Sequence, residues 1–216
     1  MNYFENNYLE NDRITNDEYK SRLTAFQIPA IIEHFQTLEN KQFLDLGCGD
    51  IVLGEFQEII GRPIKYFVQD INKNAVDVGI NRLKGKGIDT SNIFPLISPY
   101  FDLTKIKNQT LDCAFSNSLF SHLTLNSILI CLNNLYPKMK RTAKYMSSMI
   151  IIPENHNEIT YEWKVKYGAI SHSARDPYHY KFNLFKKYVE STTNFEVVQN
   201  HDYGHPFQRL VEFKAF

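Results

Sequence analysis

Short apolar runs recur along this chain, and segments with helical spacing of apolar residues lie among them. Each run is about as long as a buried strand and stops at a polar residue, a glycine or a proline. The runs occupy 42–47, 65–70, 92–97, 111–117 and about 143–152. Helical spacing is found at 51–60, 74–83, 124–139 and 181–191. This alternation predicts an α/β fold with a doubly wound, mostly parallel sheet and helices on both faces.

The beginning of the chain departs from this alternation. Residues 1–14 are rich in Asn and Tyr and predict an irregular arm. Asn16 can cap a helix that runs from about Asp17 to Leu38. Pro29 lies inside this helix, so we expect a kink or a break there.

The end of the chain predicts a hairpin. Apolar strands at 195–203 and 207–215 flank the turn sequence Gly204-His205-Pro206, and they should add an antiparallel strand to the sheet. No linker, repeat or shift in composition divides the chain. We therefore expect one domain over residues 1–216.

Charge and cysteine content argue against several classes of protein. Lys plus Arg equals Asp plus Glu, at 24 each, whereas proteins that coat nucleic acid usually carry a basic excess. The three cysteines fit free thiols in a reducing compartment better than a disulfide framework. The polar N-terminus does not resemble a signal peptide, and no apolar run approaches the length of a membrane span. We expect a cytoplasmic protein with no membrane partner, and the balanced charge argues against a nucleic-acid partner.

The strongest local signal is the segment 43–49, Phe-Leu-Asp-Leu-Gly-Cys-Gly, in which an apolar run ends in an acidic residue and two glycines. Glycines let the backbone turn sharply and approach a ligand closely. About twenty residues further on, Asp70 ends the next apolar run, where its carboxylate could accept hydrogen bonds from a ribose diol. Together the two segments predict a site for a nucleoside-like cofactor.

The spacing of the glycines separates two kinds of cofactor. A dinucleotide fingerprint requires a third glycine at position 52, where this chain has Val52. Asp45 precedes the first glycine by two residues, where a pyrophosphate would repel it. An acidic residue there instead suits a cofactor that carries positive charge, such as a sulfonium and an α-amino group.

The segment 45–50, Asp-Leu-Gly-Cys-Gly-Asp, resembles motif I of the class I S-adenosylmethionine-dependent methyltransferases. The resemblance extends in order over residues 41–152. Residues 69–71 resemble the ribose-binding end of the second strand, 101–103 the acidic motif near the adenine, and 111–123 the fourth strand with its following segment. The resemblance implies a seven-stranded sheet, S-adenosyl-L-methionine as cofactor and S-adenosyl-L-homocysteine as product.

The resemblance also assigns roles to residues and regions. Residues 1–40 would form an N-terminal arm and helix, 41–152 the cofactor-binding core, 153–180 an insert on the acceptor side, and 181–216 a C-terminal helix and hairpin. The implied cofactor-binding residues are Asp45, Gly47, Cys48, Gly49, Asp70, Ile71, Asp102, Leu103, Asn117, Ser118 and Leu119.

Two histidines are candidates for the base that deprotonates the acceptor. His122 follows the fourth strand, close to where the transferred methyl should lie, although a histidine there could equally pack under the cofactor. His179 belongs to the insert, in a cluster with His172, Arg175 and Tyr178 that could bind a polar acceptor. The alternative for this cluster is a solvated loop that leads into a helix.

No metal site is expected from these residues. The segment after the fourth strand carries no carboxylate, and His172 and His179 have no obvious third ligand. His201, His205 and Arg209 flank the last hairpin, where turn residues at a sheet edge are the favoured interpretation.

The sequence therefore predicts a methyltransferase that acts on a small polar acceptor, by O-methylation in preference to N-methylation. A sugar or a biosynthetic intermediate would suit such a site. The alternatives are a methyltransferase for protein or nucleic acid, and a catalytically silent subunit that binds a partner.

Overall fold

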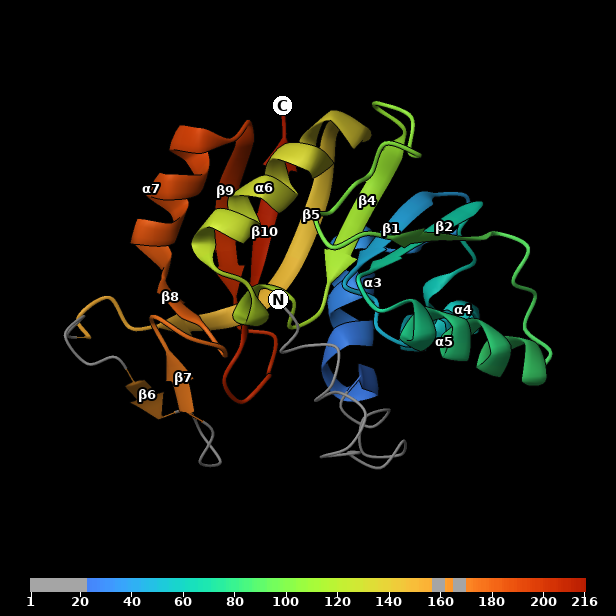
Figure 1. The fold of residues 1–216 in the computed structure, drawn as a ribbon, viewed down its shortest axis with the longest axis horizontal. Helices are drawn as coiled ribbons and strands as arrows, with labels where there is room; N and C mark the ends of the chain where they lie inside the picture. The colour runs from blue at the N-terminus through green and yellow to red at the C-terminus, as the bar shows by residue number, and fades with distance from the viewer. Residues whose placement is uncertain (1–22, 157–161, 165–169) are drawn as a thin grey trace.

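The computed structural model describes residues 23–156, 162–164 and 170–216. A twisted sheet runs through the centre of the molecule (Figure 1). Seven of its strands lie in the order β3-β2-β1-β4-β5-β10-β9. Their bounds are Ile93–Ile97, Lys65–Asp70, Gln42–Leu46, Leu111–Ser116, Met139–Ile152, Arg209–Ala215 and Phe195–His201, respectively.

The first five strands in this order are parallel, and β10 pairs antiparallel with both β5 and β9. An eighth strand, β8 (His179–Lys181), pairs parallel with the C-terminal end of β5. A separate two-stranded ribbon is formed by β6 (Glu162–Lys164) and β7 (Ile170–His172). Figure 1 shows this ribbon beyond the end of the sheet toward which β4 and β5 point.

Helices cover both faces of the sheet and enclose two apolar cores. One core packs under α6 (Leu125–Leu135) and α7 (Phe182–Thr192). The other packs under α3 (Ile28–Phe35), α4 (Gln57–Ile60) and α5 (Lys73–Gly85). Short helical turns complete the described chain: η1 (Leu23–Gln27), η2 (Val52–Phe56), η3 (Phe120–His122) and η4 (Tyr136–Lys138).

The connection between β3 and β4 covers the sheet without a helix. Residues 98–110, all described by the structure, contain turns only. Three buried side chains of this loop, Phe101, Leu103 and Ile106, enter the core under α6 in place of a helix. Strand β3 is the first in the strand order and therefore an edge strand, and Pro95 lies at its centre.

The predicted α/β sheet is confirmed, and several expected bounds need correction. The helix expected at 51–60 begins only at Val52, because Ile51 is in the left-handed region at φ 56°. It is divided into two short pieces, η2 and α4, at Phe56, whose backbone (φ −106°, ψ 18°) is not helical. The helix expected to reach Met139 ends at Leu135, and Pro137 lies in a following 3₁₀ turn. Strand β5 consequently starts at Met139 instead of near 143.

Pro29 divides the N-terminal helix, as the sequence predicts. It lies in the first turn of α3, where its missing N–H costs no helical hydrogen bond, and the π-turn η1 precedes it. The expected arm and the part of the expected helix before residue 23 lie outside the described residues. The weakly patterned insert holds β6 and β7, and β8 makes the sheet eight-stranded.

Gly79 lets α5 lie directly against the turn that follows β1. A Cβ built on Gly79 would lie 2.2 Å from the carbonyl oxygen of Asp50 and 2.6 Å from its carbon, both backbone atoms. At Gly85, in the last turn of the same helix, no atom lies within 4 Å of such a Cβ.

We therefore expect Gly79→Ala to lower the free energy of unfolding by about 1–3 kcal/mol, because the backbone of Asp50 must move. Gly85→Ala should be neutral or stabilise by up to about 1 kcal/mol, since alanine favours the helix. Urea unfolding of both variants measures the difference. Equal effects would show that the contact at Gly79 does not constrain the turn.

Candidate functional site

The turn after β1 depends on its two glycines. Gly47 (φ 69°) and Gly49 (φ 54°) both adopt left-handed backbone conformations. The N–H groups of Gly47 and Cys48 donate to the carbonyl of Gln69, at 2.8 and 3.0 Å. A Cβ on Gly47 would lie 2.8 Å from Cδ1 of Leu119, whereas one on Gly49 would meet nothing within 4 Å. Gly47 thus packs under the segment after β4, and Gly49 leaves its backbone open to a ligand.

The next position in the turn is held from the side of α5. Ile51 is fully buried and adopts the left-handed region, a costly conformation for a β-branched residue. Arg82 of α5 donates to the carbonyl of Asp50 at 2.7 Å and forms ion pairs with the Asp50 carboxylate and with Glu55. These contacts fix the backbone of a turn that lacks a third glycine.

Asp70 connects this turn to the one after β2. Its Oδ2 accepts the N–H of Gly49 at 2.8 Å, and its Oδ1 accepts the N–H of Asn72 at 2.8 Å. Asn72 in turn caps α5 by accepting the N–H of Ala75. Each carboxylate oxygen has a second lone pair that could accept a ligand hydroxyl.

Asp45 lies in β1, one residue before the strand ends at Leu46. Its side chain is buried and accepts a hydrogen bond of 2.9 Å from the hydroxyl of Tyr66. Burial raises the pKa of Asp45 to about 7, and the nearby charges of Asp70 and Asp50 act in the same direction. The Tyr66 hydrogen bond opposes this shift. Asp45 therefore changes charge near neutral pH.

A polar network positions the segment that follows β4. Ser118 (φ 56°) donates its N–H to Oγ of Ser148 at 2.7 Å, and that hydroxyl donates to Asn117 at 3.0 Å. The amide of Gln208 donates to Oγ of Ser118 at 2.8 Å. The segment is thereby tied both to β5 and to the loop between β9 and β10.

The insert contacts this segment from the other side. Nδ1 of His122 lies 2.7 Å from Oδ1 of Asp176. The N–H of Tyr178 donates to the carbonyl of Ser121 at 2.5 Å, and the hydroxyl of Tyr180 donates to the carbonyl of Leu123. The structure thus brings the predicted base His122 together with the insert that was expected to cover the acceptor.

The remaining acceptor-side candidates make side-chain contacts within the insert itself. His179 is buried, and its Nδ1 lies 3.0 Å from the hydroxyl of Ser171. Burial lowers the pKa of His179. His172 and Arg175 both face the carboxylate of Glu162, at 3.8 and 3.5 Å.

The residues predicted to lie near the adenine and the ribose differ in their exposure to solvent. The side chain of Leu103 belongs to the core under α6. Asp102 is exposed, and a hydrogen bond from the N–H of Thr104 lowers its pKa. Ile71 follows Asp70 and is about half exposed.

Sequence reasoning missed Asp176, Ser148 and Gln208. Asp176 precedes a proline, which suggested the start of a helix and hid its role as a partner of His122. Ser148 belongs to a pair of serines in the apolar second half of β5, a signal that could have been followed. Gln208 offered no local signal, because its contact with Ser118 joins segments far apart in the chain.

The strand order, the antiparallel last hairpin and the glycine turn after β1 define the fold of class I S-adenosylmethionine-dependent methyltransferases. A methyltransferase of this kind from Aquifex aeolicus superimposes with a TM-score of 0.66 at 17% identity, covering 91% of this chain and 93% of that chain. One from Mesorhizobium loti gives a TM-score of 0.60 at 10% identity, covering 87% and 96%.

A third solved structure is a complex that contains the Haloferax volcanii Trm112 methyltransferase activator. It matches with a TM-score of 0.65 at 12% identity over 93% of this chain and 94% of that chain. A scan against family models and a search of curated proteins find no match. No helix among the described residues is long and apolar enough to cross a membrane.

The burial of Asp45 predicts a pH-dependent stability. The folded state holds a proton on Asp45 that the unfolded chain has released, so stability should fall as the pH rises from about 4 to about 7. Asp45→Asn should remove this loss and raise the free energy of unfolding at pH 8 by roughly 2–4 kcal/mol.

Denaturant unfolding at pH 5 and pH 8 measures this effect. Asp77→Asn, at a side chain that is 48% exposed on α5, controls for the loss of one carboxylate. A wild-type protein and an Asp45→Asn variant with the same pH profile would show that Asp45 ionises normally in the folded state.

Proposed function

We propose that this protein transfers the methyl group of S-adenosylmethionine to a small polar acceptor. The observation that carries the proposal is the pair of turns at the ends of β1 and β2, joined by Asp70 in a class I methyltransferase fold. The solved neighbours described as S-adenosylmethionine-dependent support the choice of cofactor.

The residues around these turns fit that cofactor. Gly49 leaves space that a Cβ would fill, so a ligand can approach its backbone. The remaining lone pairs of Asp70 can accept hydrogen bonds from the two ribose hydroxyls. Asp45 supplies a carboxyl group that ionises most easily beside a positive charge, which suits a cofactor with an ammonium and a sulfonium.

When bound, the cofactor supplies an electrophilic methyl group, and the protein must deprotonate and align the acceptor. Asp176 accepts the Nδ1–H of His122 and so selects the tautomer in which Nε2 carries the lone pair. In that tautomer Nε2 can take the proton of an acceptor hydroxyl as its oxygen becomes the nucleophile. Such a positioned base typically increases the reaction rate about 10²–10⁴-fold.

His122 is the stronger of the two candidates for the base. It belongs to the turn that follows the cofactor segment 117–119, and a carboxylate fixes its tautomer. His179 is buried with its Nδ1 against Ser171. We assign His172, Arg175 and Tyr178 to acceptor binding, because the insert that carries them contacts the turn of His122.

A second candidate function is a methyltransferase that works with a partner subunit. The likeness to a chain from the Trm112 activator complex favours this alternative. The balanced charge of the chain argues against a nucleic-acid acceptor. A protein that binds the cofactor alone but turns over only in the presence of a second protein would support a partner-dependent methyltransferase.

We expect S-adenosylmethionine and S-adenosylhomocysteine to bind, and NAD not to bind. Asp70→Ala should raise the dissociation constant for S-adenosylhomocysteine about 5- to 150-fold, since it removes the acceptor of the ribose hydroxyls and of the Gly49 N–H. Asp70→Asn should lose less, and Asp77→Ala should lose nothing. Calorimetric titration decides, and tighter binding of NAD than of S-adenosylhomocysteine would refute the proposed cofactor.

We expect His122→Ala to lower kcat about 10²–10⁴-fold while leaving the affinity for S-adenosylhomocysteine within about twofold. Asp176→Asn should lower kcat less, because it disturbs the tautomer without removing the base. Formation of S-adenosylhomocysteine with a panel of hydroxyl and amine acceptors provides the assay. A large loss in His179→Ala together with normal turnover in His122→Ala would assign the base to His179 instead.

A further inference from the structure

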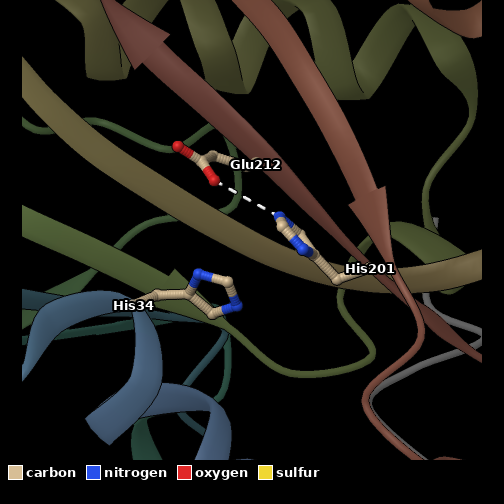
Figure 2. Close-up of side chains that lie close together, drawn as sticks. All are labelled: His34, His201 and Glu212. Carbon is tan, nitrogen blue, oxygen red and sulfur yellow. Dashed lines mark hydrogen bonds and ion pairs between the residues drawn. The ribbon is translucent and has the colours of Figure 1, made fainter.

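Three side chains from opposite ends of the chain meet on the α3 face of the sheet. His34 lies in the last turn of α3, His201 ends β9, and Glu212 lies within β10. One ligand atom from each lies within 4.8 Å of the other two. Figure 2 shows the imidazole rings of His34 and His201 and the carboxylate of Glu212 converging from the helix and the two strands.

We propose that His34, His201 and Glu212 form a binding site for one zinc ion, which links α3 to the C-terminal hairpin. Two imidazoles and one carboxylate are ligands that zinc prefers, with a water completing four-coordination. Magnesium and calcium prefer oxygen ligands in larger number. The ligand set therefore selects a transition-metal ion over these two.

The spacing of the ligand atoms suits this coordination. Nε2 of His201 lies 3.3 Å from Oε2 of Glu212, drawn as the dashed line in Figure 2. Two ligands in a tetrahedral zinc site with bonds of about 2.0–2.1 Å are separated by about 3.3 Å. Two of the three ligand atoms are thus at the required separation, and the ligand atom of His34 lies within 4.8 Å of both.

Neighbouring side chains orient the carboxylate of Glu212 toward His201. Glu212 is almost fully buried, and the ammonium of Lys144 lies 3.2 Å from its other oxygen, Oε1. This ion pair holds Oε1 and leaves Oε2 directed to His201, as outer partners of metal ligands commonly do. Within the described part of the chain, the ring nitrogens of His34 make no hydrogen bond. A half-buried imidazole of this kind gains a partner if a metal ion binds.

A zinc ion here would have a structural role. It would join the helix before β1 to the hairpin whose loop carries Gln208, the partner of Ser118. Because a metal that binds only the folded state stabilises it, zinc should raise the melting temperature. This inference does not depend on the methyltransferase proposal.

The test begins with the full chain dialysed against a chelator and then titrated with zinc sulfate. We expect about one zinc per chain by calorimetry and by elemental analysis after gel filtration, together with a higher melting temperature. Magnesium chloride at the same concentration should give neither. His34→Gln and Glu212→Gln should each weaken zinc binding at least 10-fold, whereas His156→Ala, outside the cluster, should bind zinc as the wild type does.

His34→Gln is the deciding variant, because its side chain is only half buried and the variant should fold even if Glu212→Gln does not. Circular dichroism before zinc addition checks that the variants fold. Undiminished zinc binding by His34→Gln would assign the ion to other groups, such as the cysteines, and overturn the proposal. Absence of stoichiometric binding to the wild type at micromolar free zinc would overturn it as well.

Discussion

The carboxylate of Asp70 is the contact on which the candidate site depends. It accepts one N–H from the glycine turn after β1 and one from the turn after β2, so a single side chain fixes two backbone segments that are not covalently close. The turn after β1 holds left-handed backbone conformations at Gly47, Gly49 and the non-glycine residue Ile51. Gly79 and Arg82 of α5 supply the remaining constraint, because one allows close approach and the other bonds the Asp50 backbone. The backbone of the turn is therefore preorganised for a ligand.

The proposed acceptor side is held together by contacts between different segments of the chain. The segment after β4 is held by Ser148 and Gln208 on one side and by the insert on the other. Asp176 of the insert bonds His122, so the orientation of that imidazole depends on how the insert lies over the core. Changes in the insert can therefore alter both the proposed acceptor contacts and the proposed base, while the turns at Asp70 stay as they are.

The sequence was sufficient to predict the fold, since the strand periods and the ordered motifs are local signals. Strand β2 has the predicted bounds, and the last hairpin is antiparallel as expected. Helix ends were predicted less well. The left-handed Ile51 has no local signal in the sequence, whereas Pro137 is a local helix-breaking signal that the expected bounds did not use. The pairs His122–Asp176 and His201–Glu212 were not predicted, and neither was the approach of His34 to His201. Those contacts join distant segments, and spacing along one chain carries no information about them.

The loop that replaces a helix between β3 and β4 leaves an edge strand whose sequence is almost wholly apolar. Phe94 and Ile97 are each 40% exposed along it. An exposed, apolar edge of this kind is a template on which another chain can add a strand. Pro95 interrupts that template, because it has no N–H to donate at the middle of the strand. One imino acid thus limits self-association at an edge that leads directly into the helix-free loop 98–110.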